Sequence, residues 1–366
     1  MTAHEAIDVA AAQSGAKHLQ PGCNAVADDM EMLRAARELT RDISAARPEI
    51  YWPDMLFSAA AGYAALAGAI LADDTLLALL CGVVSAVALY RALLFIHELT
   101  HIHKNALPGF RLAWNLLVGI PMLMPSFMYE GVHTLHHART RYGTADDPEY
   151  LPLALMKPWT LPVFILAAIF APPALLVRFG ILAPLGLFMP PLRKLVWQRF
   201  SALSINPQFR RRPPEGQFRR MVLWQEIGAS FWAMALLASP AFIGWRPLLV
   251  ALAVLSVTAV LNQIRTLVAH LWRNDGEPMT VTAQYLDSVN VPPPALLTPL
   301  WAPVGLRYHA LHHLLPSTPY HSLGEAHRRL KRHLGAVSTY EKASYSGLFP
   351  LLGDLVRSTM QTRQSP

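Results

Sequence analysis

Long apolar runs divide the chain, and four of them form two pairs. Residues 56–72 and 75–90 carry no charged side chain and are separated only by a two-residue acidic turn. Residues 227–245 and 247–264 repeat this pattern around a single arginine. A membrane-spanning helix needs about 20 predominantly apolar residues, with a range of roughly 17–25. The pattern therefore predicts two helical hairpins that cross a bilayer, with about four transmembrane helices in total.

Two further apolar stretches lie between the predicted hairpins. Residues 114–128 are short and are broken by Pro121 and Pro125, which favours an interfacial or re-entrant segment. Residues 158–177 are long enough to cross a membrane, whereas residues 179–192 contain three prolines. The number of spans in this middle region stays open at the level of sequence.

The composition agrees with a lipid-embedded chain. Hydrophobic residues make up 53% and charged residues 15% of the 366 residues, whereas roughly a quarter of a soluble domain is charged. This excludes an intrinsically disordered protein and argues against a soluble cytosolic enzyme. The two cysteines, Cys23 and Cys81, offer no disulfide framework. The net charge of +7 suits loops that face an anionic membrane leaflet, and we expect no nucleic-acid partner.

Basic residues mark one side of the membrane. Arginines precede both hairpins, and arginine or lysine follows both of them, whereas the turn of the first hairpin carries Asp73 and Asp74. Loops rich in Lys and Arg stay on the cytoplasmic side. We therefore expect a multi-pass protein of the bacterial inner membrane, with its termini, long loops and active site in the cytoplasm. The N-terminal part has no apolar core that would make a signal peptide.

Eight of the 15 histidines form three clusters. Imidazole suits Zn, Cu, Fe or Ni, and histidines three or four residues apart on a helix share one side. Because eight ligands are too many for one ion, the clusters predict a two-metal site. A ninth histidine, just past the last apolar run, emerges at the same predicted face. The nine candidate ligands are His97, His101, His133, His136, His137, His270, His309, His312 and His313.

The other six histidines are interpreted as hydrogen-bonded structural residues. The spacing places His103 on the opposite side of the helix that carries His97. Two of them follow the third cluster closely and remain candidates for contacts with the ligands. The six are His4, His18, His103, His321, His327 and His333.

Three other metal-binding interpretations compete. His97-Glu98-Leu99-Thr100-His101 matches the His-Glu-x-x-His pattern of zinc proteases, with Glu98 as general base and Asp275 as a possible further ligand. That leaves six clustered histidines unexplained. A ferritin-like carboxylate site needs a second Glu-x-x-His motif, and none occurs. A metal transporter would place its ligands within the spans, whereas these clusters lie at or beyond the ends of the runs.

The three clusters carry a family resemblance. Their order is His-x-x-x-His, His-x-x-His-His and His-x-x-His-His, and the third stands in the context 307–321, RYHALHHLLPSTPYH. This resembles the integral-membrane fatty acid desaturase superfamily over about residues 50–335. The resemblance implies an all-α fold: a four-helix membrane stem under a cytosolic helical cap that holds a di-iron centre, with the nine histidines as ligands. One departure is Thr266, where some acyl-CoA desaturases have Asn four residues before the counterpart of His270.

The resemblance also implies a chemistry. Two non-haem Fe ions would use O₂ as co-substrate to oxidise an unactivated C–H bond of a fatty acid or fatty acyl chain. Carboxylates commonly orient metal-bound imidazoles through the ring N–H. Four acidic residues in or beside the first two clusters are candidates for this role, namely Glu98, Asp146, Asp147 and Glu149.

Electrons for such a reaction would come from a separate carrier, because the sequence contains no flavin- or nicotinamide-binding glycine motif and no fused haem domain. A ferredoxin, a rubredoxin or a similar protein would suit. Its acidic surface would dock on basic residues of the cap, although anionic membrane lipid would suit the same residues. These are Arg139, Arg141, Arg328, Arg329, Lys331 and Arg332.

Several reactions share this kind of metal site. The third cluster is more similar to desaturases than to alkane hydroxylases, so fatty acid desaturation is the leading expectation. The alternatives are hydroxylation of an acyl chain or alkane, ketone formation, and oxidative decarboxylation of a free fatty acid to a terminal 1-alkene. For the last, Arg139 or Arg141 would pair with the free carboxylate.

The chain is therefore divided into three parts. Residues 1–49 form an N-terminal cytosolic segment, in which residues 28–46 are predicted to be an amphipathic helix. Residues 50–335 form the desaturase-like membrane and catalytic domain, and residues 336–366 form a C-terminal cytosolic tail. The apolar stripe of the amphipathic helix consists of Met32, Ala36, Leu39 and Ile43.

Overall fold

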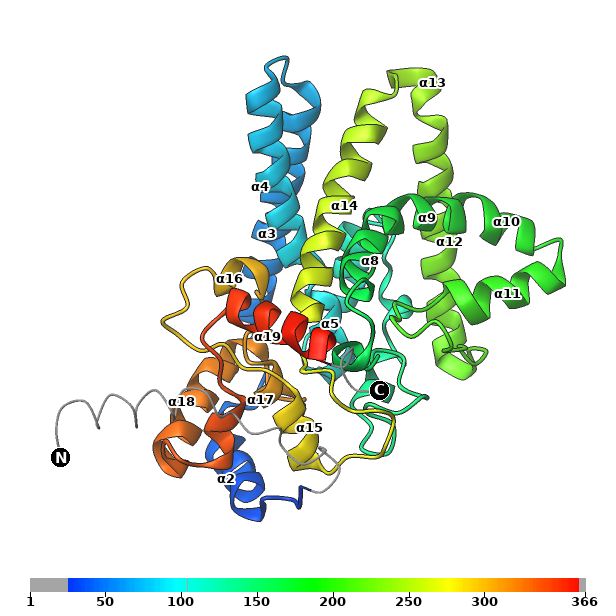
Figure 1. The fold of residues 1–366 in the computed structure, drawn as a ribbon. Helices are drawn as coiled ribbons and strands as arrows, with labels where there is room; N and C mark the ends of the chain where they lie inside the picture. Colours follow the sequence, from blue (N-terminus) through cyan, green and yellow to red (C-terminus); the bar gives the residue numbers. More distant parts are fainter. Residues whose placement is uncertain (1–25, 104, 362–366) are drawn as a thin grey trace, which may run out of the picture.

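The computed structural model describes residues 26–103 and 105–361, so Cys23, His4 and His18 lie outside the described residues. Within these two ranges every regular element is a helix, and the only β-type pairings are isolated bridges. Two helical hairpins project side by side from a compact helical cap (Figure 1). The all-α, multi-pass architecture predicted from the sequence is confirmed.

The first hairpin consists of α3 (Pro48–Leu71) and α4 (Thr75–Leu93). The acidic turn starts the second helix, because the Asp74 side chain caps α4 by accepting a backbone N–H at 2.7 Å. The two helices approach closely at Gly62, where an added Cβ would lie 2.6 Å from Cδ2 of Leu89. A small residue is therefore required at this crossing.

The second hairpin consists of α12 (Gly216–Ala238) and α14 (Arg246–Leu267), with the short α13 (Pro240–Ile243) between them. The chain reverses at Gly244, whose φ of 74° favours glycine. In Figure 1, α12 and α14 form the yellow-green hairpin beside the blue one. Both predicted hairpins are thus present.

The surfaces of the hairpins are apolar in the way that lipid requires. The exposed side chains of α4 are almost all aliphatic, and large parts of α12 and α14 expose apolar side chains. Helices that are apolar on all sides without being buried are typical of membrane spans. The exposed residues of α4 include Leu76, Leu77, Leu79, Leu80, Val83 and Val84.

A fifth segment, Thr160–Gly186, is also long and apolar enough to span a membrane. It contains four prolines, and proline in a helix interior removes a hydrogen bond and bends the axis. In Figure 1, its second half and the following α11 (Pro190–Phe200) run crosswise to α12. The segment is built from α8 (Thr160–Leu166), η6 (Ala167–Phe170), α9 (Ala171–Val177), η7 (Arg178–Leu182) and α10 (Ala183–Gly186).

The broken apolar stretch 114–128 folds back against the second hairpin. Asn115 Oδ1 accepts the backbone N–H of Ser126 at 2.8 Å, and Gln225 of α12 accepts that of Phe127 at 2.8 Å. These three polar side chains are buried. The helical elements here are α6 (Phe110–Trp114), η3 (Asn115–Gly119) and η4 (Ser126–Met128).

The cap is made of short helices and loops that come from every part of the chain. Its elements are α2 (Met30–Thr40), η2 (Arg41–Ile43), α5 (Phe95–His101), α7 (His133–His136), η5 (Leu153–Leu155), α15 (Val281–Asp287), α16 (Thr298–Trp301), α17 (His309–Leu314), η8 (Tyr320–Ser322), α18 (Leu323–Leu334), η9 (Thr339–Ala343) and α19 (Leu348–Gln361).

The predicted amphipathic helix near the N-terminus is α2. Its N-cap Asp29 accepts the backbone N–H of Met32 at 3.0 Å. Met32 and Ala36 are buried in one apolar cluster with Leu330 of α18. The apolar stripe of α2 therefore packs on the cap and not on lipid. At the other end of the chain, Leu351 of α19 is also buried.

The position predicted for His103 is wrong. Helix α5 ends at His101, because Ile102 adopts an extended conformation with φ −74° and ψ 135°. His103 follows this break, so it does not lie on the opposite side of the helix that carries His97.

Candidate metal centre

Four separate segments bring the nine predicted histidines together. Helix α5 carries the first cluster, α7 and its C-cap carry the second, and α17 carries the third. His270 follows the end of α14 at the base of the cap. All nine lie in two groups, within each of which the candidate ligand nitrogens are no more than 4.8 Å apart.

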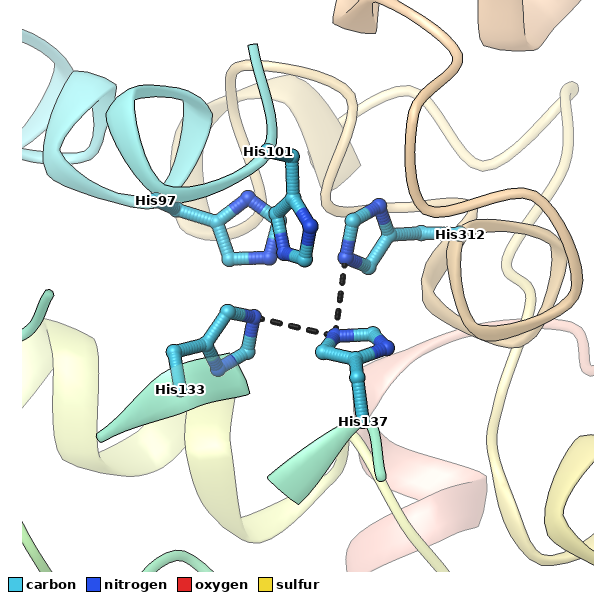
Figure 2. Close-up of side chains that lie close together, drawn as sticks. All are labelled: His97, His101, His133, His137 and His312. Carbon is cyan, nitrogen blue, oxygen red and sulfur yellow. Dashed lines mark hydrogen bonds between the residues drawn. The ribbon is translucent and has the colours of Figure 1, made fainter. Parts of the chain in front are cut away.

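The first group contains five histidines, whose rings converge on one space (Figure 2). Nε2 of His137 lies 3.0 Å from Nε2 of His133 and 3.1 Å from Nε2 of His312. The members are His97, His101, His133, His137 and His312.

The second group contains four histidines and adjoins the first. Nε2 of His309 lies 3.0 Å from Nε2 of His270 and 3.2 Å from Nε2 of His313. The rings of His137 and His313, one from each group, stack with their centroids 4.3 Å apart. The members are His136, His270, His309 and His313.

Each group fits a metal ion. Both ring nitrogens of His97 and Nε2 of His101 are buried without a hydrogen-bond partner, although buried polar atoms are normally paired. Burial lowers the pKa of three ligands in each group well below its usual range, and neighbouring histidines lower it further: His133, His137 and His312 in the first group, and His270, His309 and His313 in the second. Neutral imidazoles whose lone pairs point into a common space are the donors that transition metals require.

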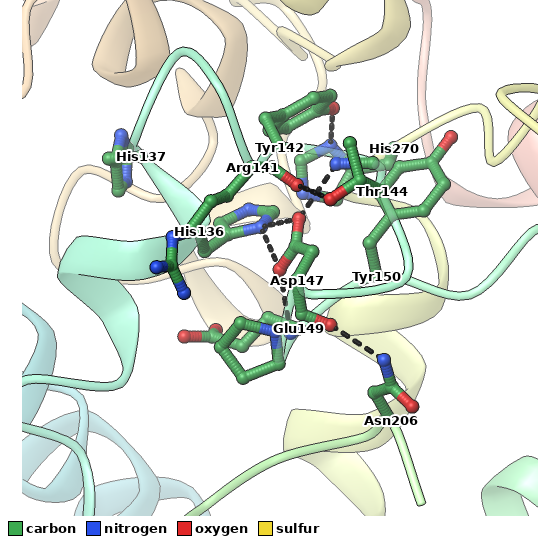
Figure 3. A network of polar contacts seen from close by, with 12 residues as sticks. His136, His137, Arg141, Tyr142, Thr144, Asp147, Glu149, Tyr150, Asn206 and His270 are labelled. Carbon is green, nitrogen blue, oxygen red and sulfur yellow. Dashed lines mark hydrogen bonds and ion pairs between the residues drawn. The ribbon is translucent and has the colours of Figure 1, made fainter. Parts of the chain in front are cut away.

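The carboxylate of Asp147 orients the imidazole ring of His136. This carboxylate is completely buried and lies 2.9 and 3.1 Å from Nδ1 of His136 (Figure 3). Burial lowers the pKa of His136, but the charge and hydrogen bond of Asp147, together with the charge of Glu149, raise it, and the net shift is upward. With Nδ1 donating to Asp147, Nε2 of His136 stays free for a metal.

The carboxylate of Glu149 orients the imidazole ring of His133 in the same way. Oε1 of Glu149 lies 2.9 Å from Nδ1 of His133, and Tyr129 donates its hydroxyl to Oε2 at 2.9 Å. Burial raises the pKa of Glu149 to about 7. Two of the four acidic candidates from the sequence therefore contact a histidine of the centre directly.

The other two acidic candidates, Glu98 and Asp146, form no hydrogen bond with a histidine of the centre. Glu98 accepts hydrogen bonds from the Tyr51 hydroxyl and from the backbone N–H of Tyr320. Its nearest oxygen is 3.6 Å from Nδ1 of His97, which is too long for a hydrogen bond. Asp146 is exposed, and only its backbone N–H is hydrogen-bonded, to Thr144.

A buried network around His270 went unrecognised in the sequence. The Tyr142 hydroxyl lies 2.8 Å from Nδ1 of His270 and donates to Asp287 at 2.9 Å. Tyr150 donates to the same oxygen of Asp287 at 2.9 Å. Burial raises the pKa of Asp287 to about 6. No motif marks these residues, because Tyr142 and Tyr150 lie in the loop after α7, whereas Asp287 ends α15 far away in the sequence.

The remaining candidates lie outside both groups. His321 and His327 are hydrogen-bonded, to Ser322 and to Tyr340 respectively. Asp275, the further ligand that a zinc protease would need, is exposed and belongs to neither group. Several basic residues proposed for docking already have partners: the pairs are Arg139–Asp28, Arg328–Glu325, Arg329–Asp42, Arg329–Glu325 and Lys331–Glu341.

Comparison with known proteins identifies the family. Residues 74–343 match the family described as Fatty acid desaturase. The chain belongs to this family. It is also 48% identical, over 337 residues, to a ceramide hydroxylase from Caulobacter vibrioides (strain NA1000 / CB15N). The alignment covers 92% of this chain and 96% of that protein. No solved structure matches the chain.

Membership of the family confirms the resemblance found in the sequence. The chain is a membrane enzyme of the desaturase and hydroxylase superfamily, whose members carry a di-iron centre. The activity named for the relative corresponds to the hydroxylation alternative. Desaturation therefore stays a prediction that the comparisons do not support over hydroxylation.

Proposed function

We propose that the chain is an O₂-dependent di-iron hydroxylase that acts on a ceramide-like lipid. The observation that carries this proposal is the 48% identity to a ceramide hydroxylase along 92% of the chain. The site supports it, because nine histidines in two adjoining groups suit two metal ions. The reaction converts one C–H bond to C–OH. One oxygen atom of O₂ enters the product and the other leaves as water, with two electrons and two protons.

The residues of the centre have defined roles in this proposal. The five-histidine group holds one iron and the four-histidine group holds the other. Bound ferrous iron supplies the redox chemistry that activates O₂ towards a C–H bond. Asp147, Glu149 and the Tyr142–Asp287 pair fix the rings of three ligands through Nδ1, so that Nε2 faces inward. The surrounding burial excludes water from the reacting centre.

The substrate and the electron donor approach from different sides in this proposal. The lipid enters from the bilayer beside the hairpins. A separate one-electron carrier of the ferredoxin or rubredoxin type docks on the cap at the cytoplasmic side. Residues 50–335 form the membrane and catalytic domain, with residues 1–49 and 336–366 as cytosolic extensions.

The test is a reaction with defined components. Purified, iron-loaded protein receives ceramide, ¹⁸O₂ and a reduced ferredoxin, and the lipid product is analysed by mass spectrometry. Hydroxylation adds one labelled oxygen atom to the lipid, whereas desaturation removes two hydrogen atoms. A dehydrogenated product without label would overturn the proposed hydroxylation.

A matched variant checks the metal centre. We expect two irons per chain in the wild type, and loss of iron and activity in His309→Ala, which removes a histidine that faces both His270 and His313. His333→Ala is the control, because His333 lies at the exposed end of α18 outside both groups. One zinc per chain in the active enzyme would exclude a di-iron centre.

A further inference from the structure

Arg265 is a buried cation beside the metal centre that lacks an anionic partner. It lies near the end of α14, and only 8% of its surface is exposed. Nη2 is 3.2 Å from Nδ1 of His309, and Nε is buried without any hydrogen-bond partner. In residues 26–103 and 105–361, no carboxylate forms an ion pair with this guanidinium.

The other buried arginines of the described residues, Arg178 and Arg211, have oxygen acceptors; Arg211 donates to the backbone carbonyls of Ser201 and Glu130. Arg178 is 2% exposed and forms an ion pair with Glu226 at 2.7 Å. Arg91 is partly buried and contacts Asp54 through two nitrogens. Because an unpaired charge within a membrane segment is unfavourable, such a residue is by default a candidate for function. Arg265 therefore differs from the arginines that stabilise the fold.

The contact with His309 does not satisfy Arg265 once the centre is loaded. Nε2 of His309 faces His270 and is the nitrogen that would bind a metal. A neutral imidazole that uses Nε2 as a ligand carries its proton on Nδ1, which is then a donor. A guanidinium has only donors. Arg265 consequently needs an oxygen acceptor from another source.

A small pocket borders this guanidinium. It is partly open and holds about 10 Å³ of free space, which is room for one water-sized group such as a carbonyl oxygen. Arg265 and His309 line it together with apolar side chains, including Trp301 and Leu306. Arg307 also borders the pocket, but its Nε already donates to the backbone carbonyl of Val291 at 2.8 Å. The pocket thus combines apolar walls with two guanidinium groups, and Nε of Arg265 has no hydrogen-bond partner.

Helix α16, which borders this pocket, and the residues just before it expose an apolar edge. Three leucines at or next to α16 are exposed, at 88%, 67% and 54%, and Trp301 at the end of α16 lines the pocket. Exposed leucines beside the base of a membrane stem suit contact with lipid. The apolar edge consists of Leu296, Leu297 and Leu300.

We propose that Arg265 binds the carbonyl oxygen at the head of the acyl chain, so that the carbon that is oxidised lies close to this carbonyl. This proposal rests on the proposed function. The His309 ring connects the two sites, because its Nδ1 lies 3.2 Å from Nη2 of Arg265 and its Nε2 faces His270 of the second histidine group. A carbon presented to that group is therefore a few covalent bonds from an oxygen held by Arg265. Oxidation in the middle of a long chain would instead place apolar methylenes against a buried cation.

The first experiment measures binding without turnover. Anaerobic, iron-loaded protein is titrated with ceramide and, separately, with a free fatty acid of the same chain length. Hydrogen bonds to a charged group typically contribute enough to change affinity about 10- to 100-fold. We expect Arg265→Met to weaken binding of the carbonyl-bearing lipid by this factor. Tighter binding of the fatty acid than of ceramide would identify a carboxylate as the preferred head group.

Two further variants keep the binding test conclusive. Arg246→Met is the matched control, because Arg246 lies at the opposite end of the same helix, where it donates to the carbonyl of Ala72. We expect its affinity to equal that of the wild type. Arg265→Gln retains a neutral donor and serves as the test if the Met variant loses iron. Unchanged affinity in the Arg265 variants that retain iron would overturn the proposal.

The second experiment locates the oxidised carbon by tandem mass spectrometry of the product. We expect the new functional group within a few carbons of the carbonyl in the wild type, and a broader distribution in Arg265→Gln. An alcohol in the middle of the chain would overturn the role of Arg265 but leave the proposed hydroxylation intact. A double bond close to the carbonyl would contradict hydroxylation while supporting the role of Arg265.

Discussion

The substitution Asp147→Asn tests how a buried carboxylate supports the metal centre. Both oxygens of Asp147 are occupied: Oδ1 accepts the backbone N–H of Glu149 and Oδ2 accepts that of Gly143, each at 2.8 Å. Both oxygens also face Nδ1 of His136. An asparagine has one oxygen and one NH₂ group. In either orientation, its NH₂ group therefore points at a backbone N–H.

The magnitude follows from this geometry. Leaving one buried donor without an acceptor costs about 1–3 kcal/mol. The charge-assisted hydrogen bond from the His136 ring is weakened as well, because the carboxylate charge is lost. Substitutions of such supporting groups typically reduce metal affinity about 10- to 100-fold. We expect a loss of iron affinity in this range for Asp147→Asn.

The neighbouring residue provides the control. Asp146 carries the same side chain one position earlier, but it is exposed and its carboxylate contacts no histidine of the centre. The assay is iron binding by the two purified variants in competition with a chelator. We expect Asp146→Asn to retain wild-type affinity. Equal iron affinity in the two variants would refute the assigned role of Asp147.

Three other predictions concern iron binding by the second histidine group, packing in the first hairpin, and the pH dependence of stability. Tyr142→Phe removes the hydroxyl that lies 2.8 Å from Nδ1 of His270, and we expect one of the two irons to bind about 10-fold more weakly. Tyr150→Phe, which removes the other hydroxyl that donates to Asp287, is the control in the same iron titration. Equal losses of iron affinity in the two variants would contradict the prediction. Gly62→Ala overpacks the crossing of α3 and α4 and should lower the free energy of unfolding by about 1–3 kcal/mol. Gly82→Ala is the control, because open space surrounds Gly82 and the free energy of unfolding should not fall. Similar melting temperatures of the two variants in detergent would argue against this packing. The melting temperature of the metal-free protein should fall as pH drops below about 6.5, because buried histidines with a lowered pKa stay neutral in the folded state while the unfolded chain binds protons. A melting temperature that does not change between about pH 7 and pH 5 would contradict this. The histidines concerned are His133, His137, His270, His309, His312 and His313.

The hairpins could be predicted because their signal is local. An uncharged run such as residues 75–90 has no favourable place in water, whatever the rest of the chain does. The proline-interrupted segment Thr160–Gly186 shows the limit of this reasoning. Its length and hydropathy satisfy the requirement for a span, but its bends and its course across α12 depend on packing against neighbours.

The acidic residues near the second cluster show the same limit at the site. The sequence offers Asp146 and Asp147 as equivalent candidates, and a single peptide bond separates them. Only the folded loop directs one carboxylate inward to His136 and leaves the other exposed. Direction depends on the backbone conformation of the loop, which composition and spacing do not encode.

The sequence by itself indicated a membrane protein with clustered histidines suited to bind metal, because apolar runs and ligand spacing are properties of contiguous residues. The tertiary structure decided how the nine histidines are distributed between the two groups. The adjacent residues His136 and His137 join different groups, and so do His312 and His313, because neighbouring side chains on a helix point in different directions. Folding also brought Arg265 to within hydrogen-bond reach of His309, 44 positions away. Contacts over such separations depend on the packing of the whole chain.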